Sequence, residues 1–226
     1  MNPATNTRTC PSPEDPRIIW VAPGDGGGRG TWSDPYRGLP GALEQVQPGE
    51  TIVLMEGEYP EDVTIQKSGT MEHPITIMGR PDAYVKVVGS CWYLYDVSDT
   101  ILSGILFVNS PSGSISAVGT CRRNRFEHLR FQDCGGGESS CTLFFGGSGG
   151  GCTIVEHCRF ERDPGFSARG QGRDSIAIMV SEGDPGSGEP IRNHVIRRNQ
   201  FLNYGYGILV GSGDRIEGEF GHIVEY

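Results

Sequence analysis

Lysine is nearly missing from this chain of 226 residues, which contains 17 arginines but only two lysines, Lys67 and Lys86. A reaction that uses a lysine side chain as its base therefore has few candidates. The formal net charge of −9 argues against general nucleic-acid binding, because phosphate contacts need a basic surface. No apolar run is long enough to span a membrane, and none has the pattern of a signal peptide. We expect neither a nucleic-acid partner nor a membrane span.

Zinc-binding spacings are missing as well, since the sequence has no Cys-x-x-Cys pair and no paired histidines. Seven cysteines are nevertheless many for a reduced cytosolic protein, and they favour an extracellular or cell-surface location. Two of them bracket a glycine-rich loop, and two others are in similar phase on successive repeats. We therefore expect three disulfides and one buried free thiol: Cys134 with Cys141, Cys121 with Cys152, Cys10 with Cys91, and Cys158 alone.

Four phenylalanines provide the main positive signal. Phe107, Phe131, Phe160 and Phe201 each end an eight-residue phrase, with an apolar residue five positions earlier and a compact side chain two positions earlier. Alternation along a strand predicts two short strands joined by a tight bend in each phrase. Such repeats cannot bury their apolar face alone and must stack on neighbours. With a third strand before each phrase, the pattern predicts an all-β, right-handed parallel β-helix with three strands per coil.

The predicted domain organisation is a flexible N-terminal segment over residues 1–17 and a single β-helix domain over residues 18–226. A short helix around residues 39–47, capped by Ser33 or Asp34, would cover the open end of the solenoid. The last residues begin another repeat whose phenylalanine does not follow, so we expect a truncated C-terminus.

Four N-terminal motifs carry a family resemblance: Trp20 to Pro23, Pro48 to Leu54, Gly57 to Tyr59, and Ser68 to Gly79. They resemble the start of pectate-lyase-like β-helix proteins, and the chain is most similar to the alginate-lyase and chondroitinase-type polysaccharide lyases and their relatives. The resemblance covers nearly the whole chain. It implies a polysaccharide or other glycan partner, bound in a groove along the strand face that precedes each two-strand phrase. The family's lysine-base and calcium-pocket motifs have no match in this sequence.

The implied groove face consists of six segments: Val63–Gln66, Trp92–Val97, Ile115–Gly119, Cys141–Phe145, Ser175–Val180 and Tyr206–Val210. Aromatic residues recur on it, and a flat ring can stack on the apolar face of a sugar. We predict Tyr93, Tyr95, Phe144 and Tyr206 as substrate-binding residues. The alternative is that these rings pack beneath the long loops.

The longest interval between repeat phenylalanines, from Phe160 to Phe201, carries two insertions at 163–174 and 181–190 on either side of one strand. Function on a rigid scaffold is usually carried by such loops. We predict Arg173 and Asp174 as catalytic residues, with Arg173 clamping a uronate carboxylate and Arg169 as a further substrate contact. Glu182 and Asp184 are candidate oxygen ligands for Ca²⁺, although an ordinary solvated turn also explains that stretch.

The predicted function is thus lyase-like, with β-elimination on a uronate-containing glycan. A hydrolase would need a second carboxylate beside Asp174, where the chain has Arg173. The alternative from a different class is a non-catalytic structural or adhesive β-helix.

Two pairs of side chains share a phase in successive repeats: His128 with His157, and Arg130 with Arg159. Stacked histidines could bind a metal ion, but no third ligand accompanies them. We interpret both pairs as a structural ladder at a bend, with Glu161 offsetting the arginine charge.

Overall fold

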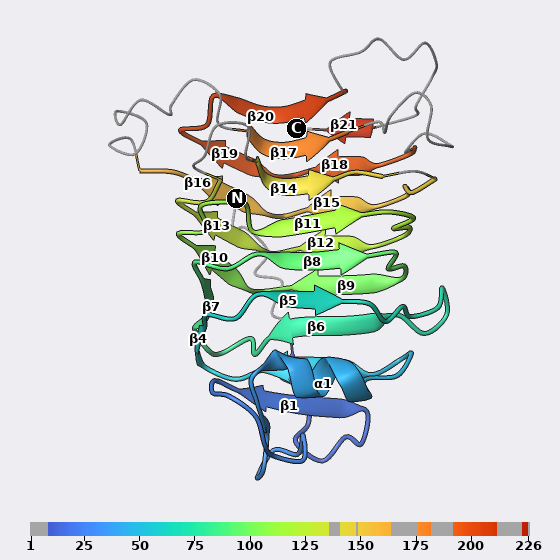
Figure 1. Cartoon of the computed structure of the whole chain (residues 1–226), viewed down its shortest axis with the longest axis vertical. Coiled ribbons are helices and arrows are strands. Elements are labelled where there is room, and N and C mark those ends of the chain that lie inside the picture. The colour runs from blue at the N-terminus through green and yellow to red at the C-terminus, as the bar shows by residue number, and fades with distance from the viewer. Residues whose placement is uncertain are drawn as a thin grey trace, which may run out of the picture.

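The computed structural model describes residues 9–135, 141–147, 149–163, 176–181, 192–211 and 223–225. Within these ranges the chain is nearly all parallel β-strand, wound into a right-handed parallel β-helix whose coils stack along one long axis (Figure 1). The short helix α1 (Leu39–Gln45) lies at the N-terminal end of the stack. The predicted fold is confirmed.

Three parallel sheets form the walls of the solenoid in the described part of the chain. Sheet A contains, in spatial order, β2 (Tyr36–Arg37), β1 (Ile18–Ala22), β3 (Thr51–Leu54), β6 (Ile75–Gly79), β9 (Thr100–Ser103), β12 (Arg125–Glu127), β15 (Ile154–Glu156), β18 (Val195–Arg197) and β21 (Ile223–Glu225). Sheet B contains β4 (Gly57–Tyr59), β7 (Val85–Val88), β10 (Leu106–Val108), β13 (Arg130–Gln132), β16 (Arg159–Glu161) and β19 (Gln200–Leu202). Sheet C contains β5 (Val63–Ile65), β8 (Trp92–Tyr95), β11 (Ile115–Val118), β14 (Cys141–Phe145), β17 (Ile176–Val180) and β20 (Tyr206–Val210).

The four repeat phenylalanines stack inside the solenoid from sheet B. Phe107 pairs in register with Phe131, Phe131 with Phe160, and Phe160 with Phe201. Their ring centroids are 5.3, 4.6 and 5.1 Å apart. Residues at one phase therefore meet the same phase in the next coil, which is why one repeated residue type builds a continuous core.

The bends between strands rely on left-handed backbone conformations. Between sheets A and B, His128, His157 and Arg198 have φ values of 53°, 55° and 55°. The two imidazole rings stack with centroids 5.2 Å apart, and Arg130 pairs in register with Arg159 on the adjoining strands. These placements confirm the expected ladder at a bend.

Helix α1 covers the N-terminal end of the core, but it is not capped as predicted. Its N-cap is Gly38, which has no side chain to cap with, rather than Ser33 or Asp34. The Leu39 N–H instead donates to Oε1 of Glu61 at 3.1 Å. At the other end, Lys67 Nζ donates to the carbonyl oxygens of Glu44 and Val46, a favourable place for a cation at a helix C-terminus.

The expected disulfides are not formed, and all seven cysteines are free thiols. The Cys121 Sγ lies 3.5 Å from the Leu94 carbonyl oxygen and 3.2 Å from that of Val118, whereas Cys152 is exposed. The Cys121 thiol points inward and Cys152 lies outward, so their similar positions in successive repeats do not bring the two sulfur atoms together. Cys158 is a buried thiol as predicted, and burial raises its pKa to about 12.

Candidate functional site

The outer face of sheet C is the candidate site. Its strands coincide with the segments expected to form the groove, and their registers align one outward position in every coil. We call this alignment the outer row: Thr64, Tyr93, Ser116, Phe144, Met179 and Leu209. Adjacent members lie one strand spacing apart, about 4.8 Å. The row follows the solenoid axis and presents a long surface suited to an extended polymer.

Two tyrosines of β8 project from this face. Tyr93, in the outer row, is 41% exposed, and Tyr95, beside Val118, is 54% exposed. Trp92 and Leu94, the alternate residues of the same strand, are fully buried, so strand alternation turns the tyrosines outward. Their predicted outward placement is confirmed.

Phe144 also belongs to the outer row but lies flatter against the sheet. Its ring is half-buried and lies over Gly146, where a Cβ atom would overlap the ring. Gly146 therefore permits the ring position. The neighbouring Phe145 faces the core and stacks on His194.

Tyr206 lies elsewhere on sheet C. It pairs in register with Ile176, which in turn pairs with Cys141, and both of these side chains are buried. Its side chain is exposed but belongs to a different row from Tyr93 and Phe144. The structure therefore brings Tyr93, Tyr95 and Phe144 together and sets Tyr206 apart.

The thiol of Cys91 and the phenol of Tyr93 form a coupled pair on the outer face. Burial raises the pKa of Cys91 to about 11, and the Cys91 charge and its hydrogen bond raise the pKa of Tyr93. Both groups are protonated at neutral pH. Tyr93 can donate a hydrogen bond to a sugar hydroxyl, but neither group is a base or nucleophile there.

Polar side chains that sequence reasoning missed border the face where sheet C bends into sheet A. The Asp96 Oδ1 accepts hydrogen bonds from the Thr120 N–H at 2.8 Å and the Thr120 hydroxyl at 3.0 Å. Arg122 is exposed, and its Nε donates to the Gly149 carbonyl oxygen. Asp96 and Thr120 are separated by the same interval as Phe107 and Phe131, so the repeat carried a signal for this contact.

Two cavities lie near the N-terminal end of the solenoid. The larger, about 640 Å³, lies between the Gly24–Gly28 loop, Arg37 and Glu61. The smaller, about 330 Å³, lies between α1 and β5, and its lining includes Thr64 of the outer row. The larger cavity is lined by the Gly24–Gly28 loop and residues near α1 and includes no residue of the outer row. The smaller cavity adjoins the row through Thr64, so the outer row with this cavity is the better candidate for a long ligand.

Five predicted site residues lie outside the described residues: Arg169, Arg173, Asp174, Glu182 and Asp184. The described strand between the two insertions is β17, which contributes Met179 to the outer row. Among the described residues, no group of three or more His, Cys, Asp or Glu side chains is arranged to hold a metal ion. No helix in the described ranges has the length and apolar character needed to cross a membrane.

No family model matches the chain. A curated relative, the uncharacterized protein YwoF of Bacillus subtilis (strain 168), is 27% identical over 128 residues, covering 51% of this chain and 27% of the relative. The chain thus spans about a quarter of that relative's length.

Solved structures with a similar architecture include a rhamnogalacturonan lyase, with a TM-score of 0.59 and 14% identity over 92% of this chain and 62% of that chain. An alginate lyase from Paenibacillus sp. str. FPU-7 has a TM-score of 0.49 and 18% identity, covering 76% of this chain and 70% of that chain. At these identities the likeness concerns the fold. The chain has the right-handed parallel β-helix fold that is also found in a rhamnogalacturonan lyase.

Proposed function

We propose that this protein binds a polysaccharide along the outer face of sheet C and acts on it in the manner of a lyase. The observation that carries the proposal is the outer row, in which Tyr93 and Phe144 are aligned along the axis with Tyr95 beside them. Exposed aromatic rings on a rigid sheet can stack on successive sugars at a low entropic cost. The fold likeness to a rhamnogalacturonan lyase supports a glycan ligand.

The lyase step would be β-elimination on a uronate-containing glycan. A base removes the proton next to the carboxylate, a carbon–carbon double bond forms, and the bond to the leaving oxygen breaks as that oxygen takes up a proton. In our proposal Arg173 neutralises the carboxylate, Asp174 assists proton transfer and Arg169 contacts the substrate. Glu182 and Asp184 would hold Ca²⁺ beside them. Support comes from sequence position, since the two insertions flank β17 of sheet C.

The test is the ultraviolet absorbance of unsaturated uronate ends, followed on alginate, pectate and glycosaminoglycans with and without Ca²⁺. We expect one polymer to give product, Arg173→Gln to abolish the signal, and Tyr93→Ala to raise KM. A protein that binds none of these polymers and forms no product would refute the proposal.

The second candidate is a non-catalytic structural or adhesive β-helix. Three titratable side chains on and beside the described outer face favour this alternative, because none of the three can act as the base that a lyase needs. Cys91 and Tyr93 are protonated at neutral pH, and Lys67 donates hydrogen bonds to helix carbonyl groups. Saturable glycan binding without product, unchanged by Ca²⁺, would select this alternative. An extracellular or cell-surface location belongs to both proposals, since most such polysaccharides lie outside the cell.

A further inference from the structure

Basic side chains gather at the corner between sheets A and B, which does not adjoin sheet C. They recur over three successive coils, on the strand pairs β12–β13, β15–β16 and β18–β19 and on the bends between them. We call this set the arginine corner: Arg125, His128, Arg130, His157, Arg159, Arg197 and Arg198.

Parallel registration brings these side chains into rows. Arg130 lies beside Arg159, and the His128 and His157 rings are inclined by only 10°. Arg198 occupies the same bend position one coil further on. The row of Arg130 and Arg159 ends at Gln200, so the third coil contributes its arginines from Arg197 and the bend residue Arg198. Successive coils are about 4.8 Å apart, so each of the three coils presents at least one arginine over about 10 Å of the axis.

Three glutamates offset only part of this charge. Glu156 binds both Arg125 and Arg197, Glu127 binds Arg125, and Glu161 binds Arg159. A fourth, Glu225, lies next to Arg197 in register on β21.

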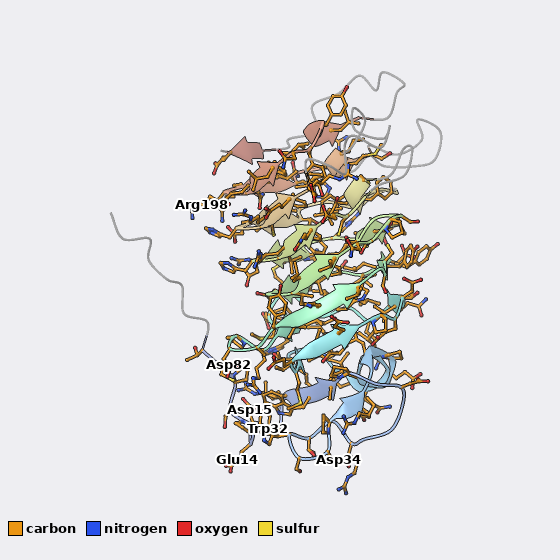
Figure 2. All side chains as sticks on the ribbon, turned by 90° about the vertical axis from the view of Figure 1, so that its left-hand side faces the viewer. Glu14, Asp15, Trp32, Asp34, Asp82 and Arg198 are labelled. Carbon is orange, nitrogen blue, oxygen red and sulfur yellow. The ribbon has the colours of Figure 1, made fainter. Side chains whose placement is uncertain are left out.

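Arg130 and Arg198 differ from the other arginines of the corner. Both are exposed, and no ion pair among the described residues includes either of them. Five arginines thus face four glutamates, Glu225 included, in a chain whose net charge is −9. Figure 2 shows Arg198 projecting from the outer edge, far along the axis from Asp15 and Asp34 at the N-terminal end.

We propose that the arginine corner is a second binding surface, for a linear carboxylated polysaccharide that runs parallel to the solenoid axis. Guanidinium groups bind carboxylates through paired hydrogen bonds, and a polymer with one carboxylate per sugar presents several carboxylates along its length to the arginines of the three coils. A nucleic acid fits less well, because the footprint is short and the rest of the chain is acidic. Binding here would hold a polymer on the protein without occupying sheet C.

The test uses an oligogalacturonate as the probe, with its dissociation constant measured by calorimetry at low and high salt. The protein carries Tyr93→Ala, Phe144→Ala, Arg169→Gln and Arg173→Gln, so that the proposed binding on and beside sheet C does not contribute. We expect salt-sensitive binding that Arg130→Gln with Arg198→Gln weakens about tenfold. The matched control is Arg17→Gln with Arg29→Gln, which removes the same charge from exposed ion pairs at the N-terminal end and should change affinity less than about twofold.

Equal losses in the corner and control variants would attribute binding to net charge and overturn the proposal. Unchanged affinity in the corner variant, or no binding at all, would do the same. A sulfated oligosaccharide or a short oligonucleotide that binds more tightly than the oligogalacturonate would overturn the choice of a carboxylated glycan. Because sheet C is already disabled, failure of the proposed function leaves this measurement unaffected.

Discussion

Phe131 lies in the middle of the phenylalanine stack, between Phe107 and Phe160. Its replacement by alanine would leave a cavity that neighbouring coils cannot fill without shifting the ladder. We expect Phe131→Ala to lower the free energy of unfolding by about 3–5 kcal/mol, measured by denaturant titration. Phe201→Ala is the comparison, because Phe201 is only half-buried at the last rung and should cost less. Equal losses of unfolding free energy in Phe131→Ala and Phe201→Ala would contradict a cooperative stack.

Gly146 is expected to control the position of the Phe144 ring. Its φ is not in the left-handed region, so Gly146→Ala is compatible with the backbone, but the new methyl group would displace the ring. We expect glycan affinity to fall about two- to tenfold, the range for one aromatic contact, with little change in stability. Ser116→Ala, in the same row but without a ring, should leave affinity nearly unchanged, and a loss as large as that of Gly146→Ala would argue against ring stacking.

Side-chain direction along a strand was predictable, but side-chain pairing between coils was not. Alternation identified the buried phenylalanines and the outward Tyr93 and Tyr95, because a strand has only two faces. The Cys121–Cys152 pair failed because sequence phase places a residue on a coil without saying which way a bend residue turns. Cys121 and Cys152 show this, with one sulfur inside and the other outside.

At the scale of elements, the ladder β12–β15–β18 is joined by Glu156, whose buried carboxylate binds Arg125 and Arg197 from the two flanking strands. Burial alone would raise the pKa of Glu156, but the hydrogen bond from Arg197 and the charge of Arg125 outweigh it and lower the pKa below 4.5. A carboxyl group whose pKa is lower in the folded protein stabilises that protein. This stabilisation is fully present when the pH is above the pKa of the group in the unfolded chain, and it is lost as the pH falls through the pKa in the folded protein.

We therefore expect acidification below about pH 4.5 to destabilise the protein partly through Glu156. Glu156→Gln should lower the free energy of unfolding at neutral pH by about 1–3 kcal/mol and flatten its decline in acid. Denaturant titrations at several pH values measure both effects. Glu161→Gln is the control, because its ion pair with Arg159 is exposed and should matter little. An acid-induced decline as steep in Glu156→Gln as in the parent would refute the assignment.

Contacts with distant partners were what sequence reasoning missed. The helix lies where it was expected, near residues 39–47, but the Leu39 N–H donates to Glu61, 22 residues further on, instead of to a local cap. The two-residue strand β2 was not predicted either, because it is defined only by pairing with β1. Neither partner is visible in a short window of sequence.

For the whole molecule, the repeat predicted the site's location better than its chemistry. All six strands of sheet C fall in the expected groove segments, because the phenylalanine register determines the phase of each coil. Asp96 and Arg122 were missed, since bend residues follow no alternation. The unequal intervals between phenylalanines correctly identified β17 as the strand between the insertions, but interval length contains no information about which side chains face a ligand.

Deletion of one whole coil tests whether the solenoid is a stack of nearly independent units. Removing residues 108–131 spans one repeat interval and would place β8, β9 and β10 beside β14, β15 and β16, with Phe107 beneath Phe160. Because each coil contacts only its neighbours, we expect a folded protein with native-like circular dichroism and a smaller denaturant m-value, in proportion to the surface removed. Deleting only 108–119 removes β11 but leaves β12 and β13, so every later strand would meet the wrong sheet, and this variant should not fold. If both deletions unfold the protein, its stability depends on the intact length instead of on contacts between neighbouring coils.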